Sequence, residues 1–100
     1  MEKNSPHYPL QDIKADVAAR GADAFTRTAL NGMDEMGLSL NEAVNVVLGL
    51  DRRMLFKSMT THADHRVWQD VYHAPCPNGK MAYIKVTLQD GSTVIQFKEK

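Results

Sequence analysis

The chain has 100 residues, of which 43% are hydrophobic and 24% charged, and this composition predicts one globular domain over residues 1–100 with a single modest core. No apolar stretch approaches the roughly 20 residues of a membrane-spanning helix, and the N-terminus lacks the apolar core of a signal peptide, so we expect a cytoplasmic protein with no membrane partner. The formal net charge is zero, which by itself argues against a nucleic-acid partner, and the one cysteine, Cys76, excludes an internal disulfide.

The first half of the chain has the pattern of three helices. Hydrophobic residues recur every three or four positions over Pro9–Arg20 and over Thr26–Met36, and a glycine follows each segment. A third helix is predicted to begin at Ser39, because Ser39-Leu40-Asn41-Glu42 is typical of a capping box, and to end near Gly49.

The second half changes to the period of two that is typical of strands. This alternation predicts strands at Met54–Met59, Val67–Tyr72, Met81–Leu88 and Thr93–Lys98. The proline- and glycine-containing segment Ala74–Gly79 is predicted to be a loop. Helices followed by consecutive strands indicate an α+β fold, with the N-terminal helices packed on one face of a C-terminal antiparallel β-sheet.

The last two strands are joined by Asp90-Gly91, which strongly favours a two-residue turn because both central positions require positive φ. Such a turn pairs residues whose numbers sum to 181. Ile84 then pairs with Phe97 on the face that the helices cover, and Tyr83 pairs with Lys98 on the open face. Paired residues have Cβ atoms about 4.5–5.5 Å apart, so we expect Tyr83 and Lys98 to be neighbours.

The alternation is less decisive in the two preceding strands. Lys57 is predicted to share a face with Leu55. Trp68 resembles a core residue, which directs the neighbouring Gln69 outward. Asp70 then lies on the core side, where the sequence identifies no partner for its carboxylate.

Lysine, glutamine and tyrosine side chains on one sheet face suit a phosphodiester substrate. RNA can be cleaved without a metal because its own 2′-hydroxyl attacks the adjacent phosphate, and the protein assists proton transfer and stabilises the extra negative charge. Lys57 and Lys98 could bind the non-bridging oxygens, and Gln69 could donate to them or orient the ribose. Tyr83 could relay a proton.

The charge distribution agrees with a polyanionic substrate better than the net charge does. Residues 1–50 carry four Lys/Arg against seven Asp/Glu, a balance of −3, and residues 51–100 carry eight against five, a balance of +3. A chain with such a charge asymmetry can steer a polyanion to one end while it stays neutral overall.

The histidines offer two other hypotheses. His62 and His65 are three residues apart, a spacing that can hold zinc, although no cysteine pair or third ligand accompanies them. A hydrogen bond from His65 to Asp64 that orders the loop is the alternative for this segment. His73, predicted to lie just after a strand, could contact phosphate.

Several short strings of the sequence, taken together, are specific enough to indicate a protein family. They are Met1-Glu2-Lys3 with Pro6-His7, Lys57 to Thr61, Asp64-His65, Trp68 to Tyr72, Tyr83 with Lys85, and Phe97 to Lys100. On these strings the chain resembles the MqsR (motility quorum-sensing regulator) toxin family over essentially its whole length. The resemblance implies a RelE-like ribonuclease fold and the toxin of a type II toxin–antitoxin system. The activity it implies is ribosome-independent, metal-independent and cofactor-free cleavage of mRNA at short GC-containing sequences.

The resemblance also implies a partner and a set of site residues. The partner would be an MqsA-like antitoxin that binds zinc and DNA, so that this chain meets DNA only through the complex. The catalytic residues implied are Lys57, Gln69, Tyr83 and Lys98. The residues expected to bind RNA are Phe56, Met59, His73 and Lys85.

Three features depart from the family pattern. Phe56 stands where tyrosine is frequent, which removes a phenolic contact to RNA, and His73 stands where arginine is common, which weakens phosphate binding at neutral pH. The neutral net charge also differs from the basic charge of the family.

The rival hypothesis is a non-catalytic module that binds protein or RNA through the open sheet face or an exposed strand edge.

Overall fold

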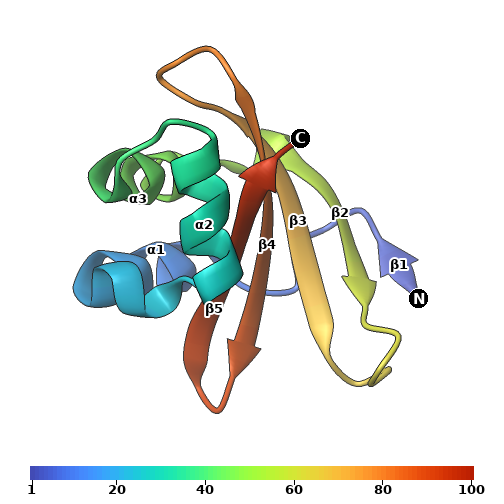
Figure 1. The fold of residues 1–100 in the computed structure, drawn as a ribbon. Coiled ribbons are helices and arrows are strands. Elements are labelled where there is room, and N and C mark those ends of the chain that lie inside the picture. Colours follow the sequence, from blue (N-terminus) through green and yellow to red (C-terminus); the bar gives the residue numbers. More distant parts are fainter.

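The structure, a computed structural model, describes residues 1–100 and consists of three helices packed against one five-stranded antiparallel sheet (Figure 1). The helices are α1 (Leu10–Arg20), α2 (Arg27–Glu35) and α3 (Leu40–Leu48). The strands are β1 (Glu2–Lys3), β2 (Leu55–Thr60), β3 (Trp68–Pro75), β4 (Met81–Gln89) and β5 (Ser92–Glu99), and they lie side by side in that order. The predicted α+β fold is confirmed. No helix is both long enough and apolar enough to cross a bilayer.

Helices α2 and α3 begin at the hydroxyl residues that cap them. The Thr26 side chain accepts a hydrogen bond of 3.0 Å from the backbone N–H of Ala29. At Ser39 both hydrogen bonds of the predicted capping box are formed, because the Glu42 N–H donates to the Ser39 hydroxyl and the Ser39 N–H donates to the Glu42 carboxylate. Each cap satisfies backbone donors that a helix leaves without an internal partner.

The core lies between the helices and one face of the sheet. Buried side chains of α1 and α3, such as Val17 and Val47, form one cluster with inward residues of the last two strands, such as Ile84 and Phe97. In Figure 1 the three helices lie together on one side of the sheet, and the opposite face carries no helix.

The β4–β5 hairpin has the predicted register. Asp90 and Gly91 both have positive φ, at 51° and 78°, and Tyr83 pairs with Lys98. A one-residue slip would turn every core side chain of β5 to solvent, so the burial of Ile84 against Phe97 stabilises this pairing.

The outer edge of β5 is covered by α2 and by the two residues before it. The Thr26 N–H donates to the Ile95 carbonyl at 3.0 Å, and Phe25 forms a single parallel bridge with Ile95. Gly32 of α2 faces the backbone of β5 so closely that a Cβ there would collide with the Phe97 carbonyl. Because glycine alone permits this approach, α2 is seated directly on the strand.

The opposite edge of the sheet contains a strand that the sequence did not predict. Strand β1 pairs with β2, so that Glu2 pairs with Met59 and Lys3 with Ser58. Two residues carry too little periodicity to identify a strand, and its position is instead decided by contacts made by residues farther along the chain.

Those contacts centre on the carboxylate of Asp70, which is fully buried on the core side of β3. It accepts hydrogen bonds from the backbone N–H groups of His7 and Tyr8, at 2.9–3.0 Å, and from the Ser58 hydroxyl at 2.6 Å. Three donors from two distant parts of the chain therefore compensate a buried charge that would otherwise be costly.

Two predictions about β2 and β3 are wrong. A bulge between Leu55 and Lys57 places Leu55 against the core and Lys57 on the open face, so these residues do not share a face. Trp68 lies outside the core cluster and is half-buried beneath the His7 ring, whose centroid is 5.1 Å away, and the Lys3 ammonium group at 4.3 Å. The N-terminal segment supplies both contacts, and its path was not evident from the sequence.

The predicted loop at Ala74–Gly79 begins too early. Ala74 and Pro75 belong to β3, where they pair with Ala82 and Met81. Pro75 is the last residue of the strand. The longer strand also places His73 inside β3 rather than after it.

We expect Asp70→Asn to lower the free energy of unfolding by about 2–4 kcal/mol, because an amide can accept fewer of the three donors and adds donors of its own. Urea denaturation measures the change. Asp34→Asn, on the solvent-exposed end of α2, is the matched control and should change stability by less than about 0.5 kcal/mol. Equal stability of the two variants would contradict the role given to Asp70.

Candidate functional site

The open face of the sheet carries the predicted site residues in neighbouring rows. One row runs across four strands from Lys57 through Val71 and Lys85 to Gln96, and the next contains His73, Tyr83 and Lys98. Rows on one face are two residues apart along a strand, which is about 7 Å. Three of the four predicted catalytic residues therefore lie in adjacent rows.

Three aromatic rings form a continuous stack across this face. The ring of His73 lies 4.5 Å from that of Phe56, at an angle of 20°, and 5.5 Å from that of Tyr83, at an angle of 38°. Phe56 is the exposed end of the stack, with 54% of its surface accessible. The bulge in β2 produces this arrangement because it turns Phe56 away from the core.

Ammonium groups flank the stack at both ends. The Lys57 nitrogen lies 5.5 Å from the centre of the Phe56 ring, and those of Lys98 and Lys85 lie 5.2 and 5.9 Å from the centre of the Tyr83 ring. Cations within about 6 Å of a ring are attracted to its face. The site thus combines a phenol with two nearby ammonium groups, and a third ammonium group lies across the stack.

Gln69 and Met59 pair with each other one row beyond Lys57, on the side away from Tyr83. Gln69 lies four residues from His73 along β3, which corresponds to roughly 13 Å. The structure therefore places Gln69 beside Lys57 but not beside the Tyr83–Lys98 pair.

Tyr83 differs from the other two tyrosines in its access to the open face. Tyr72 is buried on the core side, where burial and then the charge of Asp70 raise its pKa to about 12. The Tyr8 hydroxyl donates to the Trp68 carbonyl. Tyr83 is half-buried on the open face, which leaves it as the phenol available to a ligand there.

The environment of His73 in the stack disfavours the charged form of its ring. Its Nε2 atom is buried without a hydrogen-bond partner. Burial is the main cause that lowers the pKa of His73, and the charge of Lys100 lowers it further. His73 therefore offers a neutral ring rather than a cation at neutral pH.

Lys57 already has a partner in the folded chain. Its ammonium group lies 3.1 Å from the Glu2 carboxylate, and the Glu2 side chain is 62% exposed. Strand β1 brings Glu2 to this position because Glu2 pairs with Met59, next to Lys57 on the open face. An anion bound at Lys57 has to compete with this carboxylate.

The loop histidines have a different environment from the predicted one. Asp64 accepts hydrogen bonds from the backbone N–H and the guanidinium of Arg66, so Arg66 and not His65 is its partner. The side chains of the chain form no group of three or more His, Cys, Asp or Glu that could hold a metal ion. His62 and His65 are exposed.

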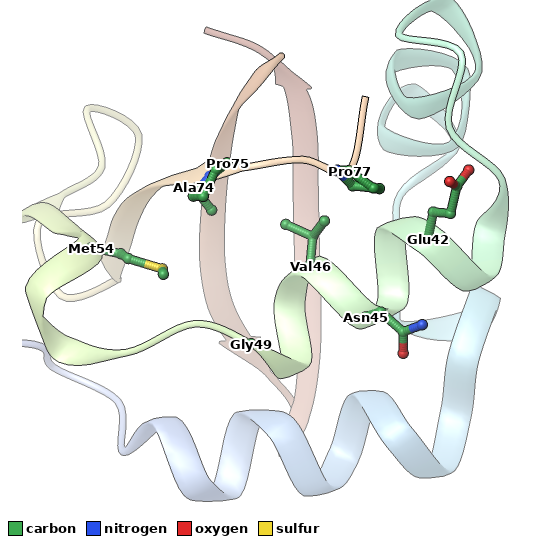
Figure 2. A pocket seen from close by; sticks show the side chains of 8 residues that line it. All are labelled: Glu42, Asn45, Val46, Gly49, Met54, Ala74, Pro75 and Pro77. Atoms are coloured by element: carbon green, nitrogen blue, oxygen red, sulfur yellow. The ribbon is translucent and has the colours of Figure 1, made fainter. Parts of the chain in front are cut away.

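A separate hollow of about 430 Å³ lies on the helical side, between α3 and the end of β3 (Figure 2). Its lining comprises Glu42, Asn45, Val46, Gly49, Met54, Ala74, Pro75 and Pro77. None of the predicted site residues lines it, and it contains no cationic side chain. Because it lacks cationic side chains, this hollow is not a site for a phosphodiester, whatever its size.

Comparison with known proteins identifies the relatives of this chain. The family model described as "Motility quorum-sensing regulator, toxin of MqsA" matches residues 5–99. The chain belongs to this family. The matched range includes Lys57, Gln69, Tyr83 and Lys98, so the resemblance inferred from the sequence is confirmed at the level of the family.

A relative that is named for its activity aligns along its full length. The mRNA interferase toxin MqsR of Escherichia coli (strain K12) is 42% identical over 100 residues, which cover 100% of both chains. The rows of the open face described above lie within the aligned length.

The neutral state of His73 should be visible in the pH dependence of stability. Because its pKa is lowered on folding, the unfolded chain binds the proton more readily, so the stabilisation is complete above about pH 6.5 and is lost as the pH falls below that value. We expect His73→Phe, which keeps a ring in the stack, to lose less stability than the parent protein between pH 7.5 and pH 5.5 in urea denaturation. His62→Gln, at an exposed histidine, should retain the full loss, and an unchanged pH dependence in His73→Phe would contradict the assignment.

Proposed function

We propose that this chain is the toxin of a toxin–antitoxin pair and that it cleaves mRNA without a metal ion or cofactor. The observation that carries the proposal is the half-buried Tyr83 phenol on an uncovered sheet face, with the ammonium groups of Lys98 and Lys85 lying 5.2 and 5.9 Å from the centre of its ring. Membership of the family and the activity for which the E. coli relative is named support the same conclusion.

The proposed reaction is attack of the 2′-hydroxyl of RNA on the adjacent phosphorus. A bond forms between O2′ and phosphorus, the bond to the 5′-oxygen breaks, and the proton lost from O2′ is balanced by one gained at the 5′-oxygen. The products are a 2′,3′-cyclic phosphate and a 5′-hydroxyl. Lys98 and Lys85 stabilise the extra negative charge, and Tyr83 passes the proton.

Lys57 and Gln69 are proposed to bind the next part of the strand rather than the scissile phosphate. They lie one and two rows from Tyr83, so a nucleotide neighbouring the cut reaches them. Met59 beside Gln69, and the exposed ring of Phe56, offer surfaces on which an unpaired base stacks.

The proposed partner is an antitoxin of the MqsA kind, which binds zinc and DNA and brings the complex to its own operon. The family description names MqsA as the protein with which such toxins pair. We also propose that the chain acts in the cytoplasm, where mRNA is available, and that its cleavage favours GC-containing sequences.

The test is incubation of a defined RNA with purified protein in EDTA, followed by analysis of the new ends. We expect cyclic phosphate and 5′-hydroxyl ends, and a loss of roughly 10²–10⁴ in rate for Tyr83→Phe and Lys98→Ala. Lys14→Ala, on α1 in the helical layer, is the matched control and should cleave normally. Intact RNA would instead support the binding module, and cleavage that EDTA abolishes would support a metal nuclease.

Removal of the Glu2 carboxylate should strengthen RNA binding. Glu2→Gln frees the Lys57 ammonium group, and a surface ion pair of this kind is worth up to about 1 kcal/mol, so we expect the Kd for single-stranded RNA to fall about twofold to fivefold at low salt. The slope of log K against log salt should steepen by about 0.7, since one more phosphate contact is made. Glu35→Gln removes the same charge from α2 and is the control; an equal effect there would refute a local role of Glu2.

A further inference from the structure

A small hollow of about 180 Å³ adjoins the Tyr83–Lys98 pair. It lies between the first turn of α2 and strands β4 and β5, and its lining comprises Thr28, Ala29, Tyr83, Lys85, Gln96, Phe97 and Lys98. Pockets for drug-sized ligands are larger, at about 300–1,000 Å³. This hollow suits one planar ring.

The lining combines two kinds of polar group. The ammonium groups of Lys85 and Lys98 are donors only and suit phosphate oxygens, whereas the amide of Gln96 offers a donor and an acceptor side by side. A donor next to an acceptor is what the edge of an unpaired base presents, and glutamine pairs with such an edge through two hydrogen bonds. The hydroxyl of Thr28 adds a group that both donates and accepts.

The wall formed by α2 is fixed in position. Gly32 allows α2 to contact the Phe97 carbonyl, and the Thr26 N–H donates to the Ile95 carbonyl at 3.0 Å. The Thr26 hydroxyl is used to cap the helix, but Thr28 lies two residues later at an exposed position that faces the hollow. Thr28 and Gln96 therefore line the hollow from two elements, α2 and β5, that these contacts hold together, as base recognition requires.

We propose that this hollow is the binding pocket for the base of a nucleotide next to the scissile phosphate, and that Gln96 and Thr28 determine which base is accepted. The inference rests on the proposed function, because it takes Tyr83 and Lys98 to hold the phosphate. The two residues act on specificity and take no part in proton transfer.

The experiment compares cleavage sites on a pool of RNA with randomised sequence around a fixed backbone. The parent protein, Gln96→Ala and the isosteric Thr28→Val are incubated with the pool, and the ends of the products are sequenced. We expect the base discrimination of each variant to fall about fivefold to tenfold at one position flanking the cut and to be retained at the other positions. Gln11→Ala, on the exposed face of α1, is the control and should reproduce the parent profile.

The outcomes separate this inference from the proposed function. Cleavage by the parent protein together with unchanged profiles in both variants would overturn the pocket and leave the ribonuclease intact. A uniform loss of rate without a change of profile would likewise overturn it, because a merely structural role has that effect. An uncut pool with the parent protein would overturn both proposals.

Discussion

The buried carboxylate of Asp70 determines how the two halves of this chain meet. Its hydrogen bonds join β3 to the Ser58 hydroxyl of β2 and to the backbone at His7 and Tyr8, just before α1. Because side chains alternate along a strand, holding Asp70 and Ser58 on the core side holds their neighbours Gln69 and Lys57 on the open face. A charge inside the fold thus supports the orientation of polar residues on its outside.

The same segment has a second effect on the surface that the proposed substrate meets. The path from Asp70 back to β1 brings the Glu2 carboxylate to the Lys57 ammonium group. The open face therefore carries the Glu2 carboxylate at one end, whereas at the other the ammonium groups of Lys85 and Lys98 both lie near the Tyr83 ring. A net charge of zero is compatible with a nucleic-acid site on these terms, since three lysines, Lys57, Lys85 and Lys98, lie on the face that the helices do not cover.

Much of the candidate site follows from local rules. The Asp90-Gly91 turn sets the pairing of Tyr83 with Lys98, because a two-residue turn leaves one register that buries Ile84 and Phe97 together. Lys57 and Gln69 also lie on the predicted face, but the reason for Lys57 was wrong. A bulge rather than simple alternation separates it from Leu55, and it also creates the stack of Phe56 on His73.

The sequence by itself therefore determined the features whose causes lie within a few residues: the capped helices, the tight hairpin and the alternation of β4 and β5. Only the tertiary structure decided the partner of Asp70, the short strand β1, the covering of Trp68 by the N-terminal segment and the pocket between α2 and β5. Each of these depends on residues far apart in the chain, and periodicity carries no information about which distant segment will pack there. The close approach at Gly32 illustrates this difference. Within α2 alone, a glycine only lowers the stability of the helix. Once β5 lies against the helix, glycine is required, because a Cβ would collide with the Phe97 carbonyl.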